Sequence, residues 1–369
     1  AARKRPFDPA APAMAALVPG GPKLVEIDLK TGRPVYNEAN RPGAPSTGGE
    51  KGTSVFATPS FLGGKNWNPI VYSPDTKLFY VPSNEWGMDI WNEPIAYKKG
   101  AAYLGAGFTI KPIAEDHIGA LRAVDPKTGK STDYPIPVLK PEQPKGGLDL
   151  EFDPQGNIWL SMMYQAGISR IDRKTHEVKA YPFPKDWQTA STQASMVSPQ
   201  HSDVDGKVWS NNQEDHYGYR LDIASGQWEN MGQAKDPAGR QVRAYGMPTD
   251  LNNNVYQLGF SATHVGLRNA KDGLVRIWTT PTPQARPRRG RVDEQNRLWF
   301  AEYGANGIGL FDPKTETIKE WKLPTPWSAP YDVVSTKNGE VWTGSMLNDQ
   351  VARLDTKIGK HTSELQSLR

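Results

Sequence analysis

A turn followed by an aromatic residue recurs five times along the 369-residue chain. The aromatic positions are Trp159, Trp209, Tyr256, Trp299 and Trp342, so successive copies are 50, 47, 43 and 43 residues apart. Around Trp299, residues 291–321 read as four short strands separated by turn residues. Four strands per unit at this period are typical of a β-propeller blade. The sequence therefore predicts an all-β protein, a propeller of four-stranded antiparallel blades.

The repeats also predict how the chain is divided. Residues 1–22 are rich in Ala, Pro and Gly and lack periodicity, which indicates an irregular N-terminal arm. Residues 23–369 are expected to form a single propeller domain. Its first part, 23–137, carries a hairpin and a blade with an insertion at 85–117, and its second part, 145–366, carries five more blades. One partial and six fuller blades make seven the expected number, with six and eight as alternatives.

Composition excludes several kinds of partner and site. The chain has 44 basic and 40 acidic residues, a balance that gives no indication of nucleic-acid binding. It contains no apolar run of 18 residues, so no membrane association is expected. The absence of Cys excludes disulfides, thiolate metal sites, covalently attached haem and a Cys nucleophile. No signal peptide is visible, and we expect a mature periplasmic or secreted monomer.

The N-terminal third carries long family-specific stretches. Residues 24–130 include FLGGKNWNPIVYSPDTKLFYVPSNEWGMDIWNEP and GALRAVDPKTGK. These resemble the pyrroloquinoline-quinone-dependent alcohol dehydrogenases, and the resemblance implies that Asn66 and Trp67 border the quinone. The vicinal Cys pair of that family is absent, and no counterpart of its metal-binding carboxylates and catalytic Asp is found. Pyrroloquinoline quinone is therefore not expected as a cofactor, and a dehydrogenase remnant is the least favoured hypothesis.

The remainder of the chain carries a second resemblance. Residues 145–359 include ARPRRGRVDEQNRLWFAEYGANGIGLFD and SAPYDVVSTKNGEVWTGSMLNDQVARLD. These are similar to the streptogramin (virginiamycin B) lyase-like propellers, whose chemistry uses histidines and a glutamate around Mg²⁺ at the central channel. The glutamate matches Glu302, whereas the two histidine positions are Arg288 and Tyr331. The chain thus reads as a chimera of two propeller families, natural, metagenomic or engineered, with a junction near residues 131–145.

Candidate site residues follow from propeller geometry, because inner strands start at the central channel and ligands bind where these starts converge. Counting eleven residues back from each aromatic marks the starts. This gives Leu148 beside Asp149, Tyr245, Arg288 and Tyr331, with Gln200 or His201 in a blade that we expect to be one residue shorter. The predicted metal ligands for Mg²⁺ or Ca²⁺ are Glu302, Asp149 and His201. The predicted catalytic residues are Glu302, His201, Tyr331 and Arg288.

The leading hypothesis is a lyase-like enzyme. A divalent metal would assist elimination or hydrolysis of an ester-like bond, such as that of a lactone, a cyclic depsipeptide or a phosphotriester. The alternative is a non-catalytic propeller that binds a ligand or protein, in which the arginines at 286–291 hold a small anionic molecule in the central channel. Structural alternatives stay open as well: Glu302 in a salt bridge, the arginine run as a solvated loop, and His201 in a structural hydrogen bond.

Overall fold

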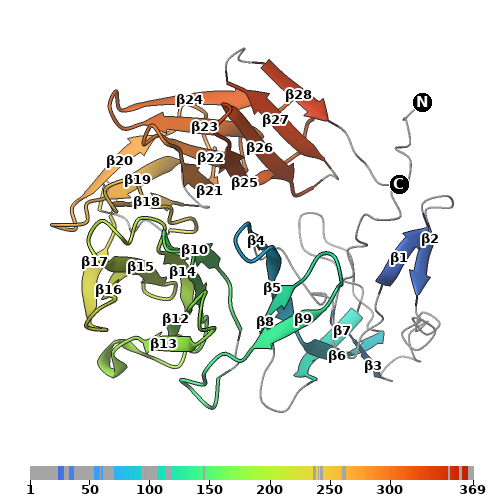
Figure 1. Ribbon diagram of the computed structural model, residues 1–369. Helices are drawn as coiled ribbons and strands as arrows, with labels where there is room; N and C mark the ends of the chain where they lie inside the picture. The colour runs from blue at the N-terminus through green and yellow to red at the C-terminus, as the bar shows by residue number, and fades with distance from the viewer. Residues whose placement is uncertain are drawn as a thin grey trace. The chain divides into compact units, whose positions relative to one another are not determined.

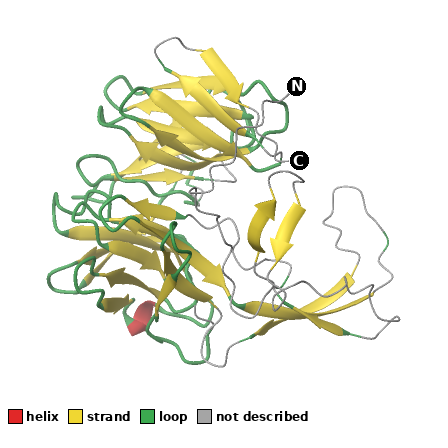
Figure 2. Cartoon of the chain, turned by 45° about the vertical axis from the view of Figure 1, so that its right-hand side comes forward, coloured by secondary structure: helices red, strands yellow, loops and turns green. Residues whose placement is uncertain are grey.

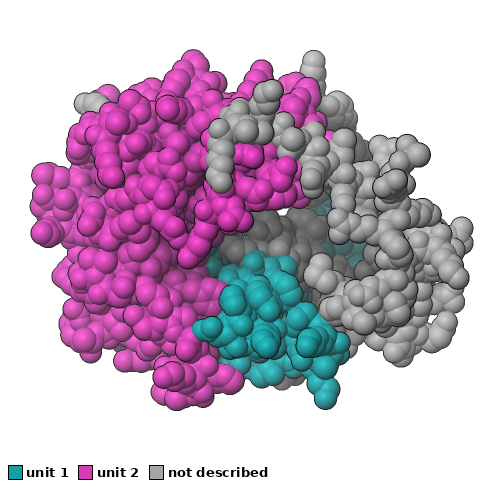
Figure 3. All heavy atoms as spheres, turned by 45° about the horizontal axis from the view of Figure 1, so that its top comes forward, with its two compact units in different colours: residues 1–150 teal, residues 151–369 magenta. Residues whose placement is uncertain are grey.

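The computed structural model describes residues 24–28, 33–36, 54–58, 60, 70–92, 96, 106–113, 119–143, 146–235, 238–239, 241, 244–259, 263–347, 350–356 and 360–364. Regular structure in these residues is β-strand, apart from the short 3-10 turn η2, Lys185–Trp187 (Figure 2). No helix in the described part is long and apolar enough to span a membrane. The chain divides into two compact units, Ala1–Leu150 and Glu151–Arg369, coloured separately in Figure 3. The all-β prediction is confirmed.

Three antiparallel sheets form the described part of the first unit (Figure 1). One is the hairpin predicted near the start of the chain, and another is a four-stranded sheet. The third joins a short strand to the two strands of the predicted insertion. The sheets are β1 (Leu24–Asp28) with β2 (Arg33–Tyr36); β3 (Val55–Ala57), β6 (Trp86–Asn92) and β7 (Ala106–Pro112); and β4 (Val71–Ser73), β5 (Leu78–Asn84), β8 (Gly119–Val124) and β9 (Ser131–Tyr134).

The second unit repeats one sheet design along the chain, with consecutive strands as neighbours in each sheet. The first two sheets are β10 (Leu150–Phe152), β11 (Ile158–Ser161), β12 (Gly167–Ile171) and β13 (Val178–Pro182), then β14 (Ala194–Ser198), β15 (Lys207–Asn212), β16 (Tyr217–Asp222) and β17 (Trp228–Gln233). The third contains β18 (Val255–Leu258), β19 (His264–Arg268) and β20 (Val275–Thr279). The last two are β21 (Pro287–Val292), β22 (Leu298–Glu302), β23 (Gly307–Asp312) and β24 (Thr317–Lys322), then β25 (Pro330–Ser335), β26 (Glu340–Ser345), β27 (Val351–Asp355) and β28 (Lys360–Glu364).

These four-stranded antiparallel sheets confirm the predicted blades. In the third sheet, the place of an inner strand is taken by bridges that pair Gly246 with Leu258 and Thr249 with Val255. The number of blades in the whole chain stays a prediction.

In two of the five copies, an aspartate explains the turn-plus-aromatic signal. Asp153 precedes Trp159 by six residues; its carboxylate accepts hydrogen bonds from the indole Nε1 (2.9 Å) and from the backbone N–H of Asn157 (2.8 Å). Asp293 binds the indole of Trp299 in the same way, at 3.0 Å. A carboxylate that accepts from successive N–H groups stabilises a tight turn between strands. The same side chain therefore fixes both the turn and the orientation of the aromatic ring.

The recurring aromatic residues form the core between neighbouring sheets of the second unit. Trp159 packs in one cluster with Val208 and Leu221 of the following sheet. Trp299 packs in another with Val333 and Val341. Burying a large aromatic ring between sheets contributes several kcal/mol each, on the order of 3–5 for removal of the side chain. The 43- to 50-residue period thus reflects one interface residue per blade.

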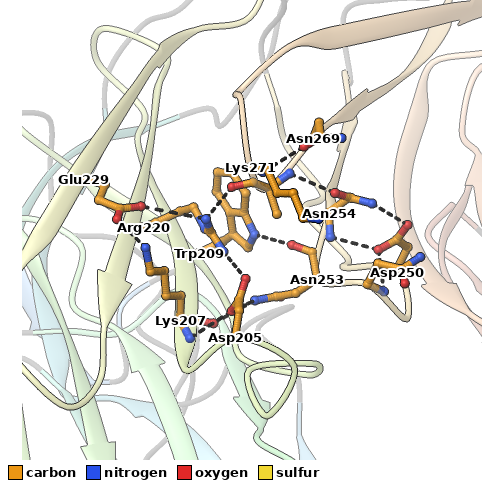
Figure 4. Close-up of polar contacts among 12 residues, drawn as sticks. Asp205, Lys207, Trp209, Arg220, Glu229, Asp250, Asn253, Asn254, Asn269 and Lys271 are labelled. Carbon is orange, nitrogen blue, oxygen red and sulfur yellow. Dashed lines mark hydrogen bonds and ion pairs between the residues drawn. The ribbon is translucent and has the colours of Figure 1, made fainter.

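A polar network joins the second and third sheets of this unit (Figure 4). The indole Nε1 of Trp209 donates to the carbonyl oxygen of Asn253, at 2.8 Å, so this tryptophan is held by the next sheet. The Asn253 amide in turn donates to Asp205 (2.8 Å) and to the carbonyl of Lys207 (2.9 Å). Arg220 forms an ion pair with Asp205, the same carboxylate that accepts from the Asn253 amide. The network fixes the register between the two sheets through groups that are mostly buried.

Candidate functional site

The starts of the inner strands lie at one edge of their sheets. Pro287 at the start of β21 pairs with Glu302, and Pro330 at the start of β25 pairs with Ser345. This confirms that Arg288 and Tyr331, each one residue further on, lie at inner-strand starts. Tyr245 precedes the equivalent bridge at Gly246.

Side chains from these strand starts converge in an aromatic–guanidinium group. We call Arg288, Tyr245, Tyr303 and Tyr331 the Arg288 cluster. The guanidinium carbon of Arg288 lies 3.8 Å from the ring centre of Tyr331 and 4.9 Å from those of Tyr245 and Tyr303. Guanidinium stacking on aromatic rings is favourable and holds the charged group in one orientation while its edge can still donate hydrogen bonds. The cluster therefore places an oriented positive charge at the strand starts.

The phenol groups of the cluster are linked to each other. Tyr245 and Tyr331 share a hydrogen bond between their hydroxyl oxygens, with either as donor. Burial, followed by this hydrogen bond, raises the pKa of Tyr331. Tyr331 is consequently a neutral hydrogen-bonding group beside the guanidinium at neutral pH.

Further arginines in and just before β21 lie near the cluster. Arg289 is buried and lies 5.7 Å from the ring of Tyr245, and Arg286, just before the strand, lies 5.4 Å from the ring of Tyr303. Arg291 is ion-paired with Glu151 at 2.8 Å. Arg288, Arg289 and Arg291 are thus part of a strand, which corrects the alternative of a solvated loop for these three arginines.

Two equivalent loops with strained backbone lead into β21 and β25. Left-handed φ values occur at Gln284 (57°), Arg286 (53°), Trp327 (60°) and Ala329 (46°). In residues other than glycine this conformation costs of order 1–3 kcal/mol, and such strain is concentrated at functional sites. The strained residues therefore lie at the same edge of the sheets as the Arg288 cluster.

Glu302 lies at the end of β22, as expected, but its carboxyl group has an unexpected partner. It is 1% exposed, and burial together with the charge of Glu320 and a hydrogen bond to Glu320 raises its pKa to about 9. Glu320 accepts hydrogen bonds from the backbone N–H of Thr282 (2.9 Å) and from its hydroxyl. Without a bound cation, Glu302 is therefore the protonated member of a buried carboxyl pair with Glu320 at neutral pH.

His201 does not lie at the start of an inner strand, so this prediction was wrong. It follows the end of β14, in the connection to β15, and its Nδ1 is 2.8 Å from the hydroxyl of Thr249. Burial lowers the pKa of His201 against the opposing charges of Asp250 and Asp203. The error arose from turn length: residues 199–206 make this connection longer than 293–297 in the later blade, instead of shorter. His201 lies at the opposite end of the inner strands from the Arg288 cluster.

Asp149 is the third expected metal ligand. It is buried immediately before β10, and no group of three or more His, Asp or Glu side chains that could hold a metal ion occurs in the described ranges. The roles of Asp149, His201 and Glu302 as ligands of Mg²⁺ or Ca²⁺ stay predictions. Asn66 and Trp67, which the quinoprotein resemblance singled out, lie outside the described residues.

The sequence interpretation missed several residues of this edge. Tyr303 directly follows Glu302, and Met346 directly follows Ser345, so both could have been found by extending the strand ends by one position. Trp327 corresponds to Gln284 when the two loops are aligned on Pro330 and Pro287. Glu320 had no sequence signal, because only the register of β24 brings it to Glu302.

Comparison with known proteins identifies the two families that the sequence indicated. The model of the Virginiamycin B lyase family matches residues 111–354. Among solved structures, a catalytically inactive virginiamycin B lyase from Staphylococcus aureus with quinupristin gives a TM-score of 0.59 at 16% identity, covering 84% of this chain and 87% of that one. A streptogramin B lyase structure gives 0.51 at 18% identity, covering 75% and 90%. Likenesses at this identity establish the propeller fold alone.

The N-terminal part is similar to quinoproteins. Quinoprotein alcohol dehydrogenase PedH from Pseudomonas putida is 71% identical over 101 residues, and a quinoprotein ethanol dehydrogenase from Pseudomonas putida is 62% identical over 104 residues. These matches cover 27% and 28% of this chain. The chain spans only 17% of the length of either relative. The two-part, chimera-like description is confirmed.

Proposed function

The chain belongs to the virginiamycin B lyase family, and from this premise we propose that it binds an anionic small molecule at the Arg288 cluster. The observation that carries the proposal is the guanidinium of Arg288, held 3.8 Å from the ring centre of Tyr331 at the inner-strand starts. A guanidinium group in a fixed orientation can bind carboxylate or phosphate oxygens bidentately. The neighbouring tyrosine hydroxyl groups supply further neutral donors.

The electrostatics of the site support binding of an anion. Arg286, Arg288 and Arg289 bring positive charge to this edge of the sheets. Positive charge at a partly buried site attracts anions. Partial burial strengthens the interaction by lowering the local dielectric constant.

Binding of acetate and inorganic phosphate, measured by calorimetry at constant ionic strength, tests this proposal. The Arg288→Met variant should lose about tenfold or more in affinity, since charge-assisted hydrogen bonds contribute about 1.5–3 kcal/mol. Arg276→Met is the matched control. Arg276 is exposed, lies on β20 at the edge of the third sheet, stacks on Trp278 and is ion-paired with Glu316. Absence of saturable binding by the wild-type protein, or equal binding by Arg288→Met, would overturn the proposal.

Cleavage of an ester-like bond is the second candidate, favoured by family membership and by the protonated carboxyl of Glu302, which could donate a proton. Elimination breaks the ester C–O bond, takes a proton from the adjacent carbon, and leaves an alkene and a carboxylic acid without change in mass. Hydrolysis adds one water. Quinupristin and simple lactones, incubated with the protein with or without added Mg²⁺ and followed by chromatography and mass spectrometry, distinguish these outcomes. Intact substrates in every condition would leave binding as the function.

A further inference from the structure

A nearly fully exposed tryptophan stands beside the Arg288 cluster. Trp327 is 82% exposed and adopts a left-handed backbone conformation, with φ of 60°, in the loop before β25. Met346 and Leu347, after β26, are 48% and 60% exposed. We call these three residues the apolar edge. Because the ring of Trp327 is exposed, it contributes little hydrophobic stabilisation to the folded protein, and its backbone conformation is strained. Together these features indicate a role in contacts with another molecule.

The loop that carries Trp327 is held in place by specific bonds. The side-chain carbonyl of Asn306 accepts from the backbone N–H of Ser328 at 2.6 Å, and its amide donates to the carbonyl of Thr325 at 2.8 Å. Ser328 is 1% exposed. The tryptophan side chain projects from an anchored loop, so the position of its backbone is defined before any ligand arrives, and little ordering entropy is lost on contact.

Backbone and side-chain contacts connect the apolar edge to the Arg288 cluster. The N–H of Met346 donates to the carbonyl of Ser328 at 2.9 Å, which links the two loops. The sulfur of Met346 lies 3.6 Å from Nη1 of Arg288. The apolar edge therefore adjoins the positive charge directly, through Met346.

We propose that the ligand of this site is an amphipathic anion, in which an aromatic or other flat apolar group is attached close to a carboxylate or phosphate. The anionic group binds at Arg288, and the apolar group lies against Trp327 and Leu347. This inference rests on the proposed anion-binding function and adds the class of ligand. Aromatic contacts favour such a group beyond the area that they bury.

The test compares acetate with phenylacetate, which carry the same carboxylate and differ by a phenyl ring. Phenylacetate should bind the wild-type protein about tenfold more tightly, the effect of one well-placed aromatic contact plus burial of the ring. Trp327→Ala should remove most of this preference while leaving the affinity for acetate unchanged. Leu274→Ala, at a 68% exposed apolar residue of another turn, should keep the preference. Phenylacetate should also quench a component of tryptophan fluorescence that is missing in Trp327→Ala.

The outcomes separate this inference from the proposed function. Equal affinities for acetate and phenylacetate, or a preference unchanged in Trp327→Ala, would overturn the inference and leave anion binding intact. Failure of both probes to bind the wild-type protein would overturn both.

Discussion

The phenol oxygens of Tyr245 and Tyr331 share a hydrogen bond although the two residues are 86 positions apart in sequence. Tyr245 precedes the inner bridge of the third sheet in the second unit, and Tyr331 is the second residue of β25. Their bond ties two inner-strand starts together across the ring of side chains that surrounds Arg288. It is thus a structural element of the candidate site as well as a constraint on its chemistry.

A double-mutant cycle with Tyr245→Phe and Tyr331→Phe should give a coupling free energy of about 1 kcal/mol in unfolding, the net contribution of a neutral hydrogen bond. Each single variant leaves one hydroxyl without its phenol partner, whereas the double variant removes both, so it should be less destabilised than the sum of the single variants. Denaturant unfolding of the four proteins measures this. Strict additivity would contradict the pairing.

Glu302→Gln should change the pH dependence of stability. An acid whose folded pKa is about 9 and whose ordinary value is 4.5 binds more protons in the folded state between these values, so stability falls as pH rises through that window. The loss approaches about 1.4 kcal/mol per pH unit. Glutamine keeps the shape without titrating. Unfolding measured from pH 5 to pH 9 should therefore show a flatter dependence in the variant and higher stability than wild type at the alkaline end; parallel curves would show that Glu302 is already ionised.

Gly304→Ala should destabilise the protein and weaken acetate binding together. A Cβ at Gly304 would collide with the backbone carbonyl oxygen of Gln284 and come within 3.0 Å of the Arg286 side chain. Because a backbone atom cannot move aside cheaply, the loop must shift, at a cost of about 1–3 kcal/mol. Gly344→Ala is the control, since a Cβ there meets nothing within 4 Å. Similar melting temperatures for the two variants would argue against this close approach.

Two buried arginines of the second unit should respond differently to removal. Arg220 forms an ion pair with Asp205 and donates to the carbonyl of Ala270, so Arg220→Met should cost about 2–4 kcal/mol. Figure 4 shows the network around Arg220. Arg268 is fully buried, and within the described residues it donates through Nη1 alone, to the carbonyls of Met231 and Gly232. Burial lowers its pKa to about 10, a sign of an uncompensated charge.

Arg268→Met should accordingly change stability by less than about 1 kcal/mol or increase it, because replacing a poorly paired buried charge by an apolar side chain removes its desolvation cost. Chemical denaturation of both variants gives the comparison. A larger loss for Arg268→Met than for Arg220→Met would mean that backbone acceptors alone compensate the Arg268 charge.

Much of the blade architecture could be predicted from sequence because its determinants are local. Asp153 and Trp159 are six residues apart, and their hydrogen bond sets a turn and an aromatic ring at once. The pattern does not suffice everywhere: Asp203 precedes Trp209 by the same six residues, but the indole of Trp209 donates to Asn253 of the next sheet. The starts of β21 and β25 followed from the same spacing, which is why Arg288 and Tyr331 were placed correctly.

The chemistry of the candidate site depended on contacts that the chain order does not show. Glu302 acquires its raised pKa from Glu320, which the register of β23 against β24 brings beside it. His201 was misplaced because the length of one connection, 199–206, is not fixed by the repeat. Sequence by itself determined the strands, their turns and the family. Tertiary structure decided which ionisable groups are charged and which meet, because burial and contacts between strands distant in sequence set both.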